Sequence, residues 1–199
     1  MITLYGMALS GNAYKVRLLL ELLGVEYEEI PVNLRTGENR AESFLALNPR
    51  GQVPTLVDGE VTVWDSQAIL VYLARRYGHE WLPMEPAPMA EVMQWLAVAE
   101  NELLFGLARA RAVKFFGRDF DLASCQAYGH GGLKVLEQQL ADREWLAAGR
   151  PTIADIACMP YAALSYMGDI PLDDYPSVRA WIDRIRTLPG FIAMEGIGA

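Results

Sequence analysis

Ser10 and Asn12 lie in a short turn, Ser10-Gly11-Asn12, between an apolar run and a helical pattern. The N-terminus of a helix offers unpaired backbone N–H groups and a partial positive charge. A hydroxyl or amide at such a turn can donate a hydrogen bond to an anion, such as a thiolate. Both residue types are also common helix N-caps. The turn is therefore interpreted either as a plain helix cap or as the edge of an anion site.

Two further segments could bind a peptide-like ligand. In Gln52-Val53-Pro54, a cis bond before the proline would turn the backbone N–H and C=O of Val53 outward, whereas an ordinary strand-entry proline would not. In Asp65-Ser66, the carboxylate could bind an ammonium group. The serine, with its helix N-terminus, could bind a carboxylate. Helix capping is again the structural alternative for this pair.

Other polar motifs favour structure over chemistry. Thr152 and Asp155 have the spacing of a capping box, which fixes a helix start. His79 and His130 are isolated, so neither a histidine-based triad nor a zinc site is supported, and we expect no metal. The segment Gly129–Gly132 lies between helical stretches rather than after a strand, which argues against a phosphate loop.

Composition limits the possible functions. The chain has 199 residues, 52% of them hydrophobic and 21% charged, and a net charge of −8. This balance is typical of a folded globular protein, and it argues against a nucleic-acid surface. The longest apolar run, residues 68–74, is far shorter than the roughly 20 residues of a membrane span. With no signal peptide and two isolated cysteines, Cys125 and Cys158, a cytoplasmic location is expected.

Strand and helix patterns alternate over the first 80 residues. A strand, an amphipathic helix ending before Gly24 and a second strand form a β-α-β unit, whose strands should be parallel. A short helix, a hairpin with Asp58-Gly59 at its turn, and another helix follow. The segments predicted for these elements are 2–5, 16–23, 26–32, 44–47, 55–57, 61–64 and 66–77.

The second half reads as helical throughout. Three prolines mark a linker over residues 79–88. Beyond it, apolar residues recur at helical spacing. The predicted helices cover 89–114, 122–140 (interrupted by glycines), 152–166 and 177–188. We therefore expect domains at 1–78 and 89–199.

Taken together and in this order, these motifs resemble the cytosolic glutathione S-transferase family. The strings that carry the resemblance are Asn48-Pro49 with Val53-Pro54-x-Leu56, Asp65-Ser66-x-Ala68-Ile69, and Thr152 to Asp155 with Pro160. The resemblance covers nearly the whole chain and is closest to a bacterial serine-type or nu-like branch. It implies an α/β thioredoxin-like N-terminal domain (βαβ-α-ββα) followed by an all-α C-terminal domain.

The resemblance also implies a site for glutathione as co-substrate. Val53 would pair through its backbone with the cysteinyl part, with Pro54 cis. Asp65 and Ser66 would hold the γ-glutamyl end. The side chains expected to face the glycyl end are Asn39 and Gln52, and those expected to stabilise the thiolate are Ser10 or Asn12.

A second substrate would bind between the two halves. It would be a small hydrophobic electrophile or a disulfide, or a peroxide, and the protein would act as a homodimer. The residues expected to line this pocket are Met7, Leu9, Phe105, Arg109 and Phe116. Arg109 and Arg111 either reach glutathione or lie on the solvated surface.

The sequence differs from related classes of the family in two motifs, and one alternative function remains open. No cysteine lies in residues 7–12, which disfavours a protein-thiol mechanism, and the Ser-Ser-Cys string of the zeta isomerases is absent. Because fold does not fix function, a non-catalytic glutathione-binding or regulatory protein on the same fold is the alternative to a transferase.

Overall fold

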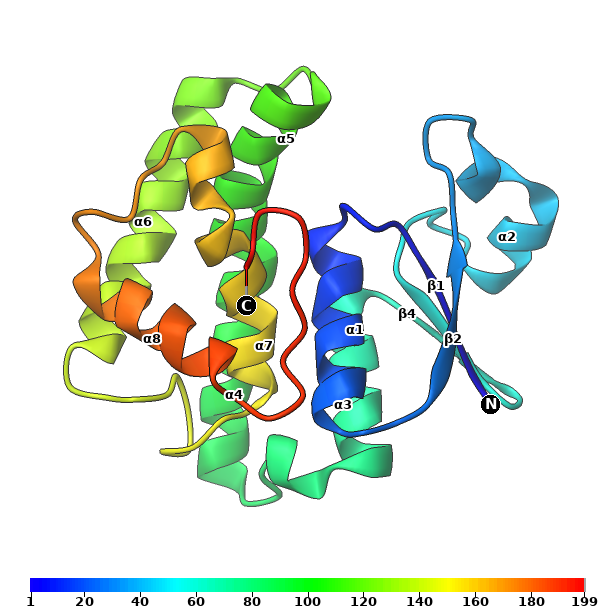
Figure 1. Cartoon of the computed structure of the whole chain (residues 1–199), viewed down its shortest axis with the longest axis horizontal. Coiled ribbons are helices and arrows are strands. Elements are labelled where there is room, and N and C mark those ends of the chain that lie inside the picture. The colour runs from blue at the N-terminus through cyan, green and yellow to red at the C-terminus, as the bar shows by residue number, and fades with distance from the viewer. Residues whose placement is uncertain (199) are drawn as a thin grey trace.

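The computed structural model describes residues 1–198 and consists of a sheet half and a helical half (Figure 1). The elements of the sheet half are β1 (Ile2–Gly6), α1 (Gly11–Leu22), β2 (Tyr27–Pro31), η1 (Glu38–Arg40), α2 (Glu42–Leu47), β3 (Thr55–Asp58), β4 (Val61–Trp64), α3 (Ser66–Tyr77) and η2 (His79–Trp81). Those of the helical half are α4 (Pro86–Val98), η3 (Ala99–Ala108), α5 (Arg109–Phe116), α6 (Leu122–Leu140), α7 (Ile153–Ala163), η4 (Ser165–Gly168) and α8 (Pro176–Arg186).

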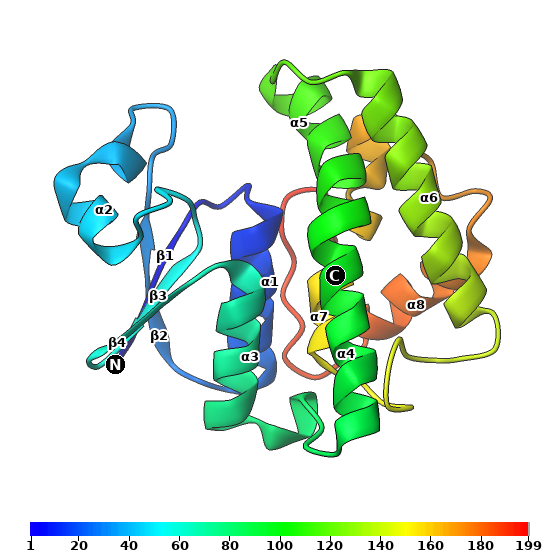
Figure 2. The ribbon, with the colours of Figure 1, turned by 180° about the vertical axis from the view of Figure 1, so that it is seen from behind.

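The sheet has four strands in the order β2-β1-β3-β4. β1 and β2 are parallel, as the β-α-β pattern predicted, and the other pairs are antiparallel. Helices α1 and α3 lie between the sheet and the helical half, while α2 lies beyond the sheet's opposite face (Figure 1, Figure 2). Leu4, Leu56 and Ile69 are fully buried in the core that the sheet shares with these helices. The predicted βαβ-α-ββα order is confirmed.

The predicted β3–β4 hairpin forms with its turn one residue later than expected. Asp58 still pairs with Val61, so Gly59 and Glu60 are the two loop residues. Gly59 has a φ of 61°. Glycine at the first position of a two-residue turn matches the right-handed twist of the strands, so the turn forms on Gly59-Glu60 rather than Asp58-Gly59.

Two expectations for the helical half were wrong in detail. Pro86 and Pro88, which were expected in the linker, lie in the first turn of α4. Backbone N–H groups in the first turn of a helix make no intrahelical hydrogen bond, so proline, which lacks this group, is tolerated there. Helix α6 runs without interruption through its glycines. A Cβ at Gly129 would lie 2.7 Å from Leu107 Cδ2, and one at Gly132 would lie 2.9 Å from Glu102 Cβ. These glycines allow close helix packing instead of breaking the helix.

The long helix predicted over 89–114 is present but not uniform. Its middle, η3, is a π-helix. Helix α4, η3 and α5 follow one another without a break and form one continuous rod (Figure 2). The widened segment packs against α6, where Gly106 lies so close that its Cβ would be 2.3 Å from the backbone nitrogen of Gly129. The π-helical segment is thus the part of the rod that packs closely against α6. The regular apolar spacing of the sequence did not indicate this change of helix type.

Helix α7 lies at the centre of the molecule, and all of its residues are buried. The predicted capping box at its start is confirmed: the Thr152 side chain accepts from Ala154 N, and Asp155 accepts from Thr152 N. Asp155 also accepts hydrogen bonds from Leu146 N and Trp181 Nε1. The motif therefore ties α7 to the preceding loop and to α8.

After α8 the chain turns back and runs along α1, between the two halves (Figure 1). The Tyr14 hydroxyl donates to the Ile192 carbonyl at 2.7 Å, and the backbone of Gly190 lies against Glu21. Ile197 is fully buried. Within residues 1–198, no helix has the length and apolar character needed to cross a membrane.

Candidate functional site

Two adjoining cavities open at the start of α1. The smaller, about 530 Å³, lies over the sheet half and is bordered by Glu100, Leu104 and Arg118 of the helical half. The larger, about 1020 Å³, lies between β1–α1 and α5. Ser10, Leu34 and Arg118 border both cavities. A ligand in one cavity can therefore contact a ligand in the other near Ser10.

The α1 turn places Ser10 as the helix N-cap. Its Oγ accepts a hydrogen bond from Ala13 N at 3.2 Å. Accepting this bond leaves the hydroxyl hydrogen available for donation, so capping and anion binding are compatible roles for one side chain. Asn12 lines the smaller cavity, and its Oδ1 is buried with no partner in the described chain. The turn thus presents two polar groups that a ligand can satisfy.

The loop before β3 is held by Asn48. Its Nδ2 donates to the Gln52 carbonyl at 2.8 Å and to Thr55 Oγ1 at 3.0 Å. The Val53–Pro54 peptide bond is cis, as the family resemblance implied. Val53 and the exposed Gln52 line the smaller cavity, whereas Pro54 is buried and does not.

Asn39 reaches the same cavity from η1. Its Nδ2 donates to the Gly51 carbonyl at 2.7 Å, which joins η1 to the loop before β3. The side chain lines the cavity together with Arg40 and Arg50. The polar residues predicted at the glycyl end are therefore close to basic side chains.

At the start of α3, Asp65 rather than Ser66 is the N-cap. Its Oδ1 accepts from Gln67 N at 3.0 Å, and its φ of 79° is unusual for a residue other than glycine. Its Oδ2 pairs with Arg50 at 3.2 Å at the rim of the smaller cavity. Ser66 is buried behind this rim, with no hydrogen-bond partner for its Oγ in the described residues.

A buried polar group lies beside the site. Lys15, one turn along α1 from Asn12, is fully buried, and its Nζ is 5.2 Å from the centre of the Tyr161 ring. Burial lowers the pKa of Lys15, and the charge of Glu100 opposes that effect. Glu100 borders the smaller cavity and accepts from Gln67 Nε2 at 2.9 Å. Lys15 therefore lies buried behind the smaller cavity, and Glu100 lies on its border.

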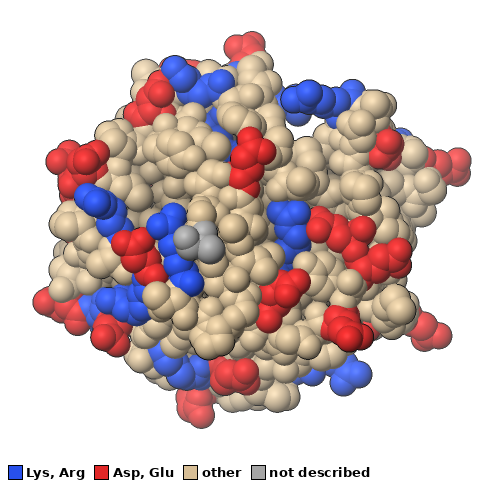
Figure 3. Space-filling model, in the orientation of Figure 1, with Lys and Arg blue, Asp and Glu red and all other residues tan. Residues whose placement is uncertain are grey.

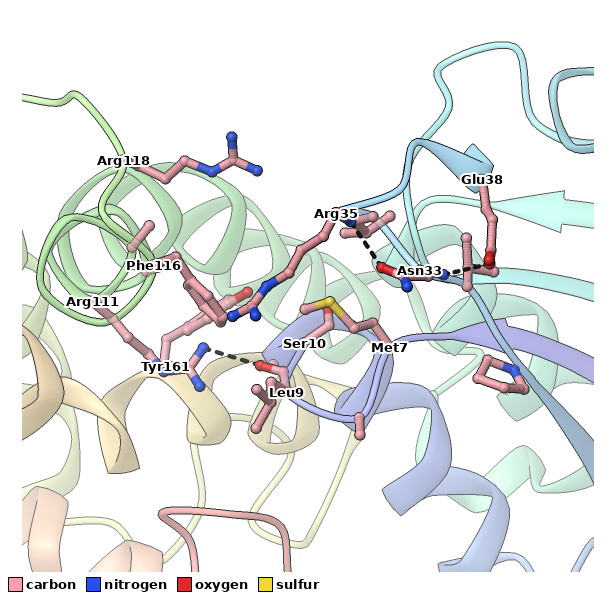
Figure 4. Close-up of a pocket in the computed structure, with 17 residues that line it drawn as sticks. Met7, Leu9, Ser10, Asn33, Arg35, Glu38, Arg111, Phe116, Arg118 and Tyr161 are labelled. Carbon is pink, nitrogen blue, oxygen red and sulfur yellow. Dashed lines mark hydrogen bonds between the residues drawn. The ribbon is translucent and has the colours of Figure 1, made fainter. Parts of the chain in front are cut away.

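The larger cavity is lined by apolar side chains together with three arginines, Arg35, Arg111 and Arg118. Of the five residues predicted for the second substrate, Met7, Leu9 and Phe116 line it. Arg109 and Phe105 lie outside both linings and contact each other, with the guanidinium carbon 4.1 Å from the ring centre. Figure 4 shows the lining residues projecting from the loop between β1 and α1, from α5 and α7, and from the loop after β2.

The sequence did not indicate Tyr161 as a lining residue, and Arg111, expected at glutathione or on the surface, lines the larger cavity. Tyr161, from α7, packs on Gly11, where a Cβ would lie 2.7 Å from its Cε1, and burial raises its pKa to about 12. Arg111 is buried and donates to the Leu9 carbonyl at 3.1 Å. It follows Leu107 by four positions on the apolar side of its helix, a pattern that could have identified it as a buried cation.

The charges around the smaller cavity suit an anionic ligand, although the chain as a whole is acidic. Three arginines line it, Arg40, Arg50 and Arg118, against two carboxylates, Asp65 and Glu100. Over the described part of the chain, no cluster of three or more His, Cys, Asp or Glu residues is suited to a metal ion.

Comparison with known proteins identifies the family. The model of the glutathione S-transferase N-terminal domain matches residues 1–75, and that of the C-terminal domain matches residues 130–189. Glutathione S-transferase GstB of Escherichia coli is 33% identical over 95% of both chains. A maleylacetoacetate isomerase of Pseudomonas aeruginosa is 32% identical over 94% of this chain and 92% of its own.

A solved structure supports the same conclusion. It is described as a possible glutathione S-transferase from Rhodopseudomonas palustris. It superposes with a TM-score of 0.92, at 35% identity and 98% coverage of both chains. Family models, curated relatives and the structure of the site agree, and the chain therefore belongs to the glutathione S-transferase family.

Proposed function

We propose that the protein binds glutathione in the smaller cavity and activates its thiol for attack on a second substrate in the larger one. In this proposal the Val53 backbone pairs with the cysteinyl unit. Asp65 binds the γ-glutamyl ammonium, and the N-terminus of α3 at Ser66 binds the carboxylate beside it. Asn39 and Gln52 face the glycyl end. The lining of one cavity by most of these residues supports this assignment.

The proposed chemistry is stabilisation of the thiolate. A free thiol has a pKa of about 8.5, so only a small fraction is ionised at neutral pH. The Ser10 hydroxyl keeps a hydrogen to donate while it caps α1. The Asn12 amide can exchange donor for acceptor by a half-turn about its last bond. Donors to the charged form lower a pKa, and the N-terminus of α1 acts in the same direction.

The position of Ser10 carries the proposal, because it borders both cavities. A sulfur held beside Ser10 faces the larger cavity, where an electrophile, a disulfide or a peroxide can approach it. The new bond then forms between sulfur and the electrophilic atom, and the leaving group departs with the electron pair. We also propose that the enzyme is cytoplasmic, as its composition leads us to expect, and a homodimer, as the family resemblance implies.

The decisive experiment measures the thiol pKa of bound glutathione from the ultraviolet absorbance of its thiolate. We expect a pKa below that of free glutathione in the wild-type protein. Ser10→Ala and Asn12→Ala should each raise it by about one to two pH units. This range follows because a hydrogen bond to a charged group contributes about 1.5–3 kcal/mol and 1.36 kcal/mol equals one unit. The double variant should approach the free value.

Ser124→Ala is a matched control, because Ser124 bonds Asp121 at the start of α6, away from both cavities. It should leave the thiol pKa unchanged. Calorimetric titration that shows no binding at millimolar glutathione would refute the proposal. Binding without turnover of aryl halides, peroxides or mixed disulfides would instead favour the non-catalytic alternative.

A further inference from the structure

The larger cavity has a buried cation at its base. Arg111 is 3% exposed, and its Nη1 donates to the Leu9 carbonyl at 3.1 Å. Its Nε faces Met167 Sδ at 3.1 Å, and the Phe115 and Phe116 rings each lie 5.1 Å from its guanidinium carbon. The remaining nitrogen, Nη2, is buried with no hydrogen-bond partner among residues 1–198.

Two more arginines stand at the mouth of this cavity. Arg35, from the loop after β2, and Arg118, just beyond α5, are exposed and project toward the opening (Figure 4). Figure 3 shows basic side chains gathered over the gap between the two halves at this end of the molecule. None of the three arginines forms a salt bridge with another described residue.

The carboxylate in the lining does not neutralise them. Glu38 accepts hydrogen bonds from Asn33 N at 2.7 Å and from Thr36 Oγ1 at 3.4 Å, within its own loop. A buried guanidinium without a counter-ion is costly, and burial lowers the pKa of Arg111 accordingly. In a chain with a net charge of −8, three unpaired arginines around one cavity form a local site for an anion.

We propose that the second substrate carries a carboxylate on a small apolar body. The carboxylate binds the Arg111 guanidinium, and the apolar body packs on Met7, Leu9 and Phe116. Arg35 and Arg118 attract the anion at the mouth. This inference rests on the proposed function and names the substrate class of the same site. The glutathione sulfur then attacks the electrophilic carbon, a C–S bond forms, and the leaving group departs with the bonding electrons.

The test compares para-(chloromethyl)benzoate with para-(chloromethyl)benzamide, which match in size and differ in charge. In both, the thiolate displaces chloride. We expect kcat/KM, divided by the uncatalysed rate constant, to favour the benzoate by about tenfold or more, as is typical of charge-assisted hydrogen bonds. Added salt should reduce the preference.

Arg111→Met should abolish the preference, and Arg111→Lys should restore part of it. Because Arg111 also bonds Leu9, the exposed Arg35→Gln variant provides a second test that does not disturb a buried contact. It should lower kcat/KM for the benzoate several-fold and leave that for the benzamide unchanged. Lys114→Gln removes one positive charge from α5 outside both cavity linings and should change neither.

Binding of unreactive para-methylbenzoate, measured by calorimetry, separates this inference from the catalytic proposal. Binding that is absent for para-methylbenzamide and lost in Arg111→Met supports the anion site even if no electrophile is turned over. Equal kcat/KM for the two chlorides, or no discrimination between the two methyl compounds, overturns it. So does an Arg35→Gln variant whose only defect is a higher Kd for glutathione, since the arginines would then serve the tripeptide.

Discussion

Removing the Asp155 carboxylate should destabilise the whole molecule. Asp155 is fully buried and accepts four hydrogen bonds: from Leu146 N at 3.1 Å, Thr152 N at 2.9 Å, Thr152 Oγ1 at 3.2 Å and Trp181 Nε1 at 2.9 Å. Asp155→Ala deprives two backbone N–H groups and one indole N–H of their acceptor. The hydroxyl of Thr152 can rotate, so it contributes less.

The expected size follows from two opposing effects. Each buried donor left without an acceptor costs about 1–3 kcal/mol, or about 6 kcal/mol for three. Burial raises the pKa of Asp155 from 3.8 to about 6, so keeping the carboxylate ionised at neutral pH costs about 3 kcal/mol that the alanine variant avoids. The net loss in the free energy of unfolding should be about 3 kcal/mol.

The same raised pKa predicts the sign of the pH dependence. The folded state binds more protons than the unfolded state between the two pKa values, so this group's contribution is complete below 3.8 and is lost as the pH rises through about 6. The stability difference between wild type and Asp155→Ala should therefore be larger at the acidic end of this window than at neutral pH.

Urea unfolding monitored by tryptophan fluorescence measures these differences. Asp121→Ala is a matched control, because Asp121 also caps a helix, α6, but is exposed, and water can replace it as the acceptor. It should shift the urea midpoint much less than Asp155→Ala. A loss below about 1 kcal/mol for Asp155→Ala, or a loss equal to that of the control, would refute this account of the network.

Three other predictions concern packing, binding and thiol chemistry. Gly106→Ala places a Cβ 2.3 Å from a backbone nitrogen of α6 and should cost about 1–3 kcal/mol in thermal unfolding, whereas Gly131→Ala, with no atom within 4 Å, should slightly raise Tm. Asp65→Asn keeps a cap for α3 but loses the negative charge. Calorimetry should show a Kd for glutathione about tenfold higher, while Tm stays unchanged. An unchanged Kd would contradict the proposed role of Asp65. Cys125 and Cys158 are buried, and burial raises the pKa of both thiols, so a chromogenic thiol reagent should label them only after unfolding; rapid labelling of the native protein would show this to be wrong.

Much of the fold could be predicted because its signals are local. The parallel β-α-β unit, the β3–β4 hairpin and the Thr152–Asp155 capping box each depend on neighbouring residues, and all three are present. The hairpin turn was misplaced by one residue because Asp58-Gly59 and Gly59-Glu60 both contain the required glycine. The glycines of α6 were misread because their role depends on a helix that packs against them.

The site was predictable to a similar degree. Most of the predicted turn and loop residues line one cavity, because each lies beside an element end that the sequence marked; Pro54 and Ser66 are buried and do not line it. Tyr161 and Arg118 reach the site from parts of the chain that no local pattern connects to it. Arg109 was placed in the pocket from its position on the helix, and Arg111 was left either at glutathione or on the surface. Tertiary packing instead buries the Arg111 guanidinium.

The chain segment after α8 has a consequence for how the protein acquires its structure. It covers α1 of the sheet half through contacts such as that between Tyr14 and Ile192, which are 178 positions apart in sequence. During synthesis on the ribosome, the first helix is made long before this segment emerges. The face of α1 that this segment covers therefore completes its native packing only after residues 190–192 have been made. Closing so long a loop slows folding. The sheet half should consequently complete its packing after the helical half has been synthesised, rather than before it.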